Sequence, residues 1–215
     1  KLCEELFLRV VASYSLAQAI RDKIVSDYKI SIIKTPLDDV ILKPYVKKPM
    51  TDKKRFNALT FIINKMDKEG RNAQFMRLNR IRLVQKSQSK IDRTKELLKK
   101  YSEERILIFC GLVEVAESLG IPSYHGRIKD KTIFEDFVAG KTKHLAVVKI
   151  GNSGVTYVKL NRVVINYFDS NAENLAQKIN RAMNMDFDNP DKCADIVILS
   201  SMEEVELNWL RKALE

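Results

Sequence analysis

The second half of the chain alternates short apolar runs with stretches in which apolar residues recur at helical spacing. Apolar runs of four to eight residues without polar alternation predict strands that are buried on both faces. The predicted strands are RILIFC (105–110), IPSYHG (121–126), HLAVVKI (144–150), RVVINY (162–167) and DIVILS (195–200), and the predicted helices are 112–120, 131–139, 171–183 and 202–214. This order predicts an α/β fold in which helices flank a mostly parallel sheet.

Two of these helices carry start signals. Ser170 followed by Glu173 has the pattern of a capping box, which predicts a helix start there. Ser200 followed by Glu203 has the same pattern. In open parallel sheets, ligands bind beyond the carboxyl ends of the strands. The chemistry is therefore expected in the loops after Cys110, Tyr124, Ile150 and Tyr167.

The first hundred residues follow a different pattern. Helices are predicted over 15–27 and 55–66, with the strand KISIIKT (29–35) between them. Residues 71–101 form a strongly basic helical segment, whose apolar side chains we expect to pack on the α/β core. The residues expected to pack inward are Phe75, Leu78, Ile81 and Leu83, and those expected to face solvent or a partner are Arg77, Arg80 and Arg82.

Composition adds a partner to this picture. The chain has 215 residues, 45% hydrophobic and 31% charged, which suits one globular domain with part of a second. Its formal net charge is +10, and a basic surface attracts nucleic acid through counterion release. A solvated basic face without a partner is the alternative. No apolar run approaches the roughly 18–20 residues that span a bilayer, so we expect no membrane partner.

The cysteines and histidines do not indicate a metal site. Three cysteines lie far apart and in no metal-binding spacing, which favours a reducing cytoplasm. Cys110 and Cys193 stand within apolar runs, which predicts that both pack in the core. His125 has no second ligand at metal spacing, so we expect no bound zinc.

The stretch FEDFVAGKT ends like a phosphate-binding loop. That pattern requires a glycine five residues before Gly140, where the chain has Glu135. A carboxylate there would repel phosphates, and Phe134, Phe137 and Val138 are spaced like one face of a helix. The stretch is therefore predicted to be a helix that ends at Gly140.

Taken in order, several segments resemble the conserved motifs of one enzyme family. KIDRTKELLKKYSEERILIFC resembles the helix and strand of motif IV, and YHGRIKDK followed by F-x-x-G resembles the stretch after it. KIGNSGVTYVKLNRVVI resembles motif V, and NLAQKINRAMN resembles motif VI, whose usual form is Q-x-x-G-R-x-x-R. The chain thus resembles the second RecA-like domain of a superfamily-two helicase, of the phage and DNA-repair type related to UvsW and RadD.

The resemblance implies a domain organisation. Residues 1–35 look like the junction from a first RecA-like domain, residues 36–103 form the basic helical segment that packs on the core, and residues 104–215 form the C-terminal RecA-like domain. The P-loop and the Asp-Glu pair that bind ATP and Mg²⁺ in this family occur nowhere in the sequence. ATP and Mg²⁺ are therefore expected to be held mainly by the N-terminal RecA-like domain of the same full-length chain, and this segment alone is expected to be inactive.

Motif V implies a set of binding residues. Ser153 and Gly154 match the family's pattern, while Thr156 stands where aspartate is common. A glycine at such a loop lets backbone N–H groups approach a phosphate. The resemblance implies nucleotide contacts at Gly154 and Thr156, and nucleic-acid contacts at Arg127, Asn152 and Ser153. A plain turn between strands is the alternative.

Motif VI implies the catalytic residues, which also bind nucleotide. Gln177 and Arg181 match at the family's spacing and are expected on the first turns of their helix. Arg181 would reach the γ-phosphate and stabilise the charge that develops in hydrolysis. Asn180 replaces the usual glycine and Asn184 replaces the second arginine, which argues against fast hydrolysis. An amphipathic helix with a solvated arginine is the alternative.

These motifs together imply the C-terminal motor domain of an ATP-dependent DNA helicase or translocase, with RNA as the alternative substrate. The resemblance places it in the bacterial cytosol or in that of a phage-infected host. The alternative from another class is a non-enzymatic nucleic-acid-binding or scaffold protein built on a decayed helicase domain. Asn180 and Asn184 favour that alternative.

Overall fold

The computed structural model describes most of the chain. The described residues are 15–37, 50–128, 130–149, 155, 157, 159–169, 171–184, 186, 188–189 and 191–214. Within them, six strands form one sheet in the order β1-β6-β5-β2-β4-β3, and every neighbouring pair is parallel. The strands are β1 (Asp27–Thr35), β2 (Ile106–Cys110), β3 (Ser123–Tyr124), β4 (His144–Val148), β5 (Arg162–Ile165) and β6 (Cys193–Ser201). The predicted α/β fold with a parallel sheet is confirmed.

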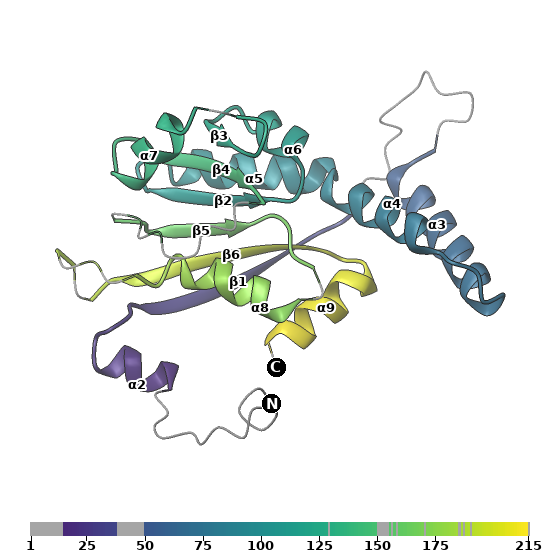
Figure 1. Cartoon of the computed structure of the whole chain (residues 1–215), viewed down its shortest axis with the longest axis horizontal. Coiled ribbons are helices and arrows are strands. Elements are labelled where there is room, and N and C mark those ends of the chain that lie inside the picture. Colours follow the sequence, from purple (N-terminus) through teal and green to yellow (C-terminus); the bar gives the residue numbers. More distant parts are fainter. Residues whose placement is uncertain are drawn as a thin grey trace.

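Helices cover both faces of the sheet. Helices α5 (Gln88–Lys100) and α6 (Val113–Ser118) pack on one face, and α7 (Thr132–Val138), α8 (Ala172–Asn180) and α9 (Glu204–Leu214) pack on the other (Figure 1). No helix in the described part of the chain is both long enough and apolar enough to cross a membrane.

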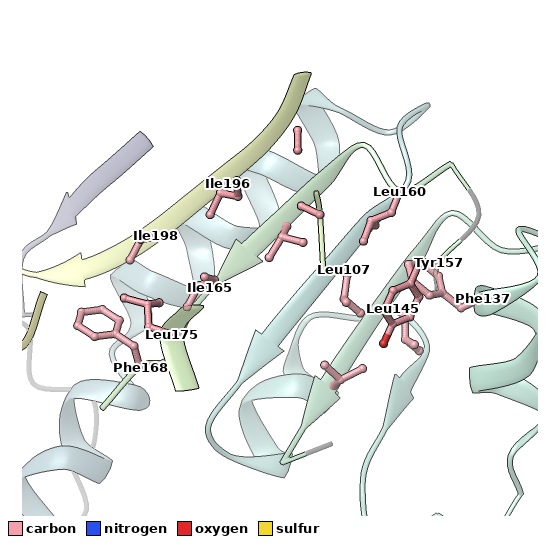
Figure 2. Close-up of a cluster of buried hydrophobic side chains, with 14 of the residues drawn as sticks. Leu107, Phe137, Leu145, Tyr157, Leu160, Ile165, Phe168, Leu175, Ile196 and Ile198 are labelled. Atoms are coloured by element: carbon pink, nitrogen blue, oxygen red, sulfur yellow. The ribbon is translucent and has the colours of Figure 1, made fainter. Parts of the chain in front are cut away.

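Successive residues of a buried strand contribute to opposite cores. Ile106 and Ile108 of β2 pack with α5 and α6, whereas Leu107 packs in the cluster that contains Phe137 and Leu175. Figure 2 shows this second cluster, in which side chains from four strands meet those of α7 and α8. Because side chains alternate between the two faces of a strand, a strand covered on both sides must be apolar throughout. This continuous run of apolar residues is the pattern that predicts these strands from the sequence.

The first helix is shorter than predicted. α2 covers Leu16–Arg21, capped by Ser15, rather than residues 15–27. Lys23 then takes a positive φ of 53°, a conformation that right-handed helices exclude, and the chain turns into β1. The predicted strand is therefore confirmed and the predicted helix end is wrong.

The predicted capping residues of the last two helices are wrong. α8 is capped by Asn171, whose side chain accepts hydrogen bonds from the backbone N–H groups of Glu173 and Asn174. Ser170, the predicted cap, lies outside the described residues. Ser200 is buried inside β6, because the pairing of β1 with β6 extends the strand to its next residue, and α9 begins at Glu204.

The basic helical segment predicted over 71–101 divides into two helices, and the helix predicted over 55–66 is longer than predicted. Helices α3 (Asp52–Lys68) and α4 (Gln74–Gln85) form a hairpin that projects away from the sheet, whereas α5 packs against it (Figure 1). The root of the hairpin is buried, where Phe56, Leu83 and Val84 cluster together. Leu83 thus packs inward as predicted.

The rest of α4 presents a different face from the one predicted. Phe75 and Leu78 are 66% and 42% exposed, so the expectation that they pack on the core is wrong. Arg77 forms an ion pair with Asp67 of α3 at 2.7 Å, and Arg80 is half-buried against the same helix. The arginines face α3 because the hairpin gives α4 a neighbour that the periodicity of α4 alone does not identify.

The two described cysteines have different environments. Cys110 is buried at the end of β2, as predicted. Cys193 is exposed, so the prediction that it packs in the core is wrong. It is the first residue of β6, where the strand has only begun to enter the sheet.

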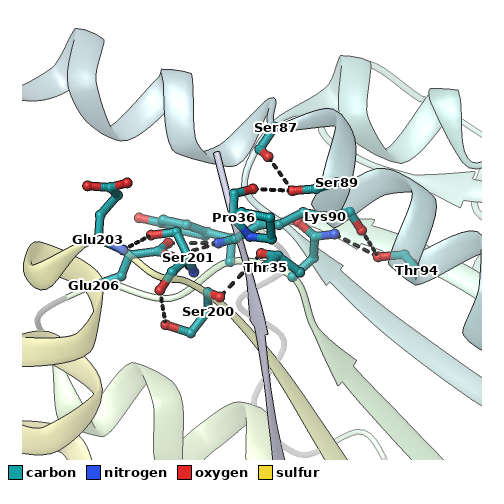
Figure 3. A network of polar contacts seen from close by, with 12 residues as sticks. Thr35, Pro36, Ser87, Ser89, Lys90, Thr94, Ser200, Ser201, Glu203 and Glu206 are labelled. Atoms are coloured by element: carbon teal, nitrogen blue, oxygen red, sulfur yellow. Dashed lines mark hydrogen bonds and ion pairs between the residues drawn. The ribbon is translucent and has the colours of Figure 1, made fainter. Parts of the chain in front are cut away.

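A buried polar network lies at the carboxyl ends of β1 and β6 (Figure 3). Lys90 of α5 is fully buried, and its ammonium lies 2.8 Å from both carboxylate oxygens of Glu206 on α9. Glu206 also accepts a hydrogen bond from the backbone N–H of Ser201. The hydroxyl of Thr35 donates to the carbonyl of Ser200 at 3.2 Å. The network therefore ties α5 and α9 to the carboxyl ends of two strands.

Candidate active site

A cavity of about 270 Å³ opens at the carboxyl edge of the sheet, beside α8. Its walls come from the ends of β2 and β4, from the segment after β5 and from one side of α8. The lining residues are Phe109, Cys110, Lys149, Tyr167, Asp169, Asn174, Gln177, Lys178 and Arg181. The cavity thus reaches residues at or next to the starts of three of the four predicted loops, namely Cys110, Lys149 and Tyr167.

Gln177 and Arg181 line this cavity together. They are four residues apart on α8, a spacing that places side chains on the same side of a helix. The expectation that they lie on the first turns is wrong, because Arg181 is the residue that ends the helix. Its guanidinium is half-buried and donates to the carbonyl oxygen of Val155 at 3.3 Å. Gln177 is exposed and also lines the cavity.

The residues predicted from motif V lie outside the described part of the chain. This holds for Asn152, Ser153, Gly154 and Thr156. Arg127 is described and is exposed in the turn between β3 and α7. It does not line the cavity, so among the described candidates the structure brings together Gln177 and Arg181 but not Arg127.

The charge of the cavity is positive. Among the described residues, Lys149, Lys178 and Arg181 line it with three cationic side chains, against the single carboxylate of Asp169. That carboxylate is occupied within its own loop, because one oxygen accepts from the backbone N–H of Asn171 at 3.0 Å. An anion that enters the cavity would therefore meet an excess of positive charge.

Lys178 stabilises one wall of the cavity. Its ammonium donates to the carbonyl oxygen of Tyr167 at 2.9 Å and lies 4.9 Å from the centroid of the same residue's ring. Burial lowers the pKa of Lys178, and the nearby Asp169 opposes that change. Burial, together with Asp169, raises the pKa of the Tyr167 hydroxyl to about 12. Tyr167 is thus a neutral wall residue at neutral pH.

Cys110 lies on the apolar floor of the cavity and does not act as a thiol nucleophile. Burial raises the pKa of Cys110 to about 12, so its thiolate is essentially absent at neutral pH. Among the described residues, no group of three or more His, Cys, Asp or Glu side chains is arranged to hold a metal ion. The cations and hydrogen-bond donors that line the cavity suit it to binding an anion.

Gly111 allows the Tyr167 wall to approach the end of β2. A Cβ atom at position 111 would lie 2.7 Å from Cγ of Tyr167 and 2.6 Å from Oε1 of Gln85. Both distances are shorter than side-chain contacts allow, so the position requires glycine. Sequence reasoning missed Gly111, Tyr167 and Lys149 as site residues. The adjacency of Lys178 to Gln177 was the one signal in the sequence that could have identified a further wall residue.

The sequence profile of the helicase conserved C-terminal domain matches residues 89–186. The match begins in α5 and ends beyond α8, so it includes every described residue that lines the cavity. No curated protein sequence matches the chain.

Solved structures share the fold at low sequence identity. The Sulfolobus solfataricus SWI2/SNF2 ATPase core in complex with dsDNA matches with a TM-score of 0.57, covering 83% of this chain and 42% of its own, at 14% identity. The C-terminal part of the Fun30 ATPase domain matches with 0.53, covering 87% of this chain and 89% of its own, at 15% identity. S. cerevisiae Dbp5 bound to RNA and ADP BeF3 matches with 0.50, covering 58% and 35%, at 16% identity. The fold is that of a RecA-like helicase C-terminal domain, and the chain spans about a third of the Dbp5 chain.

Proposed function

We propose that this chain is the C-terminal motor domain of an ATP-dependent DNA helicase or translocase of the phage and DNA-repair type. In this proposal it supplies motifs IV, V and VI to an ATP site shared with a first RecA-like domain of the same full-length protein. The match of residues 89–186 to a helicase C-terminal domain supports the class of protein. The DNA substrate, the repair or phage role and a cytoplasmic location are parts of the proposal.

One observation carries the proposal above the others. Gln177 and Arg181, the two residues that match motif VI, line one cavity whose cations outnumber its carboxylates. A solvated helix face, the alternative for Arg181, would not be expected to border a positively charged cavity at the carboxyl edge of a parallel sheet. This position therefore favours a role in binding an anionic ligand.

The residues present fit the phosphates of a nucleotide. Arg181 and Lys149 can neutralise negative charge, and Gln177 can donate a hydrogen bond from its amide. Mg²⁺ and ATP, held mainly by the first RecA-like domain, would supply the phosphoanhydride bond and its activation by the metal. Arg181 would exchange its hydrogen bond with the Val155 carbonyl for contact with the phosphoryl group and stabilise its developing charge.

Nucleic acid is the proposed polymer substrate. The net charge of +10 supports binding to a polyanion, and Arg127 is exposed and free of the cavity walls. Proteins with this fold include one bound to dsDNA and one bound to RNA. We favour DNA because the motifs resemble those of DNA-repair helicases. A nucleic acid that tracks across both domains would be moved as the cleft between them opens and closes.

The alternative is a non-enzymatic nucleic-acid-binding or scaffold protein. The observation that favours it is the position of Asn184, which stands where the family has a second arginine. Its carbonyl accepts hydrogen bonds from the Ser26 hydroxyl at 3.1 Å and the Lys192 ammonium at 3.0 Å, and it does not line the cavity. Position 184 therefore contributes no second cation to the site.

The test uses the full-length protein and the variant Arg181→Ala. We expect DNA-stimulated kcat to fall on the order of 10²-fold or more, because arginine fingers act mainly in the transition state. KM for ATP should change less than kcat. The loss of one neutral-acceptor hydrogen bond should lower stability by about 1 kcal/mol.

The matched control is Arg211→Ala, which removes an exposed arginine from α9, away from the cavity. Its kcat should equal that of the wild type. Unchanged turnover in a folded Arg181→Ala protein would contradict the assignment of motif VI. Salt-dependent DNA binding by a wild-type protein with no ATP turnover would support the scaffold alternative.

A further inference from the structure

Three lysines in the described part of the chain have positive φ values. They are Lys23 at 53°, Lys149 at 53° and Lys159 at 49°. This backbone conformation is unfavourable for a residue with a Cβ atom, and such strain is common at functional sites. Three positions therefore share one type of strain and one side chain, so their surroundings can be compared.

Two of these lysines have ordinary surface partners. Lys23 pairs with Asp191 at 3.1 Å, and Lys159 pairs with Asp188 at 2.8 Å. Lys149 has neither a hydrogen bond nor an ion pair with another described residue. It directly follows β4, is exposed and lines the cavity with Arg181. Its strained backbone thus places an ammonium at the cavity rather than at a carboxylate.

The other cations of the cavity already have partners. Lys178 donates to the Tyr167 carbonyl at 2.9 Å and lies over that ring, so it acts on the wall. Arg181 donates to the Val155 carbonyl. Lys149 is therefore the cation best placed to receive a ligand without first breaking a contact to a described residue.

Asn184 stands where the second arginine of motif VI is usual, and it provides no cation to the cavity. Its backbone forms an antiparallel bridge with Val25, and its carbonyl accepts from Ser26 and Lys192, the residues that directly precede β1 and β6. Residue 184 is thus tied to the amino-terminal edge of the sheet, whereas Lys149 stands at the carboxyl edge.

We propose that Lys149 supplies the second cation that meets the phosphates of the nucleotide in this cavity, beside Arg181. This inference rests on the proposed function, because it assigns a further residue to the same ATP site. A lysine acts as a compact point charge, which suits a phosphate group without the fixed two-pronged geometry of arginine. The αL backbone turns the chain after β4 so that its side chain borders the cavity.

The test compares Lys149→Gln with Lys159→Gln in the full-length protein. Both variants remove an ammonium from a lysine with positive φ, and they differ in whether it borders the cavity. We expect Lys149→Gln to lower nucleic-acid-stimulated kcat on the order of 10²-fold, the lower end of the cost of removing a single group that stabilises transition-state charge. Lys159→Gln should keep the wild-type kcat. Lys149→Arg, which retains the charge, should recover most of the lost rate.

Lys149→Gly separates the cation from the backbone strain. Glycine adopts positive φ freely, so the melting temperature should be no lower than that of the wild type. Its kcat should nevertheless fall as far as that of Lys149→Gln. A Lys149→Gly protein with the wild-type kcat would overturn the proposal, because strain rather than charge would then explain the lysine.

Three further outcomes distinguish this inference from the function on which it rests. Reduced kcat in Arg181→Ala with unchanged kcat in Lys149→Gln overturns the role of Lys149 and leaves the proposed function standing. Absence of both ATP turnover and ATP binding in the wild type overturns both. If Lys149→Gln reduces the salt dependence of DNA binding while kcat at saturating DNA is unchanged, the ammonium meets DNA phosphates, and the assignment to the nucleotide is overturned.

Discussion

Charged side chains have opposite environments at the two ends of the sheet's carboxyl edge. Above β1 and β6, Lys90 is fully buried and both oxygens of Glu206 lie 2.8 Å from its ammonium. Above β2, β4 and β5, Lys149 stands at a cavity with no partner among the described residues. We call the first region the closed end and the second the open end. The difference teaches that pairing, rather than charge itself, separates structural lysines from those available to a ligand.

The closed end also contacts the open end. Asn166 donates from its side-chain amide to the Thr94 hydroxyl at 2.8 Å, and Thr94 in turn donates to the carbonyl of Lys90. The next residue, Tyr167, forms a wall of the cavity. These hydrogen bonds thus connect the closed end to the residue next to Tyr167, which forms a wall of the open end.

The largest expected effect is at the closed end. Glu206→Ala leaves the Lys90 ammonium buried without its partner, which should lower the free energy of unfolding by about 3–5 kcal/mol. Replacing both residues, as Lys90→Met with Glu206→Leu, should recover most of this loss because no charge then remains buried. Urea denaturation of the three proteins measures both values. A loss below 1 kcal/mol in Glu206→Ala would mean that the pair is not a structural element.

An intermediate effect is expected where the two ends meet. Gly111→Ala places a Cβ atom 2.7 Å from Cγ of Tyr167, so the ring must move. Overpacking of this kind costs about 1–3 kcal/mol. The displaced wall should also lower kcat in the full-length protein. Gly126→Ala is the control, because nothing lies within 4 Å of the added atom there. Equal stability of the two variants would show that Tyr167 yields without cost.

The smallest effect concerns the floor of the open end. The folded state raises the pKa of Cys110 from 9.0 to about 12, so above pH 9 the unfolded thiol ionises while the folded thiol stays protonated. The folded state then binds more protons, and stability falls as pH rises from 9 towards 12. Between pH 8 and pH 10 this contributes a loss of about 1 kcal/mol.

Cys110→Ala should lack this contribution, so its loss of stability between the two pH values should be smaller than that of the wild type. Cys193→Ala, which removes an exposed thiol, is the control. Denaturation at pH 8 and pH 10 gives the comparison. An identical pH dependence in all three proteins would show that water reaches the floor of the cavity.

The sheet could be predicted because strands that are buried on both faces consist of continuous runs of apolar residues. Ile106, Leu107 and Ile108 are all apolar since their strand has helices on each side. The helix ends were less accessible, because Asn171 and Ser170 are both good caps and only the path of the chain selects one. Phe75 was misplaced because the neighbour of α4 is α3 rather than the sheet.

Site residues could be predicted only where their spacing along a helix places them on the same side. Gln177 and Arg181 could be paired from the sequence because four residues make about one helical turn. Lys149 could not, because a positive φ at a lysine has no signature in the sequence. Gly111 likewise needed the structure, since its constraint comes from Tyr167, which is distant in the sequence.

The pairing of the first and last strands has a consequence for synthesis on the ribosome. β1 pairs with β6, and 165 residues separate Thr35 from Ser200, which share a hydrogen bond. β1 leaves the ribosome first, but its partner strand follows only after a delay on the order of 10–30 s at common rates of translation. During that interval the isoleucines of β1 lack β6, the strand with which β1 pairs in the described sheet. The nascent domain is therefore expected to depend on chaperones until its final strand is released.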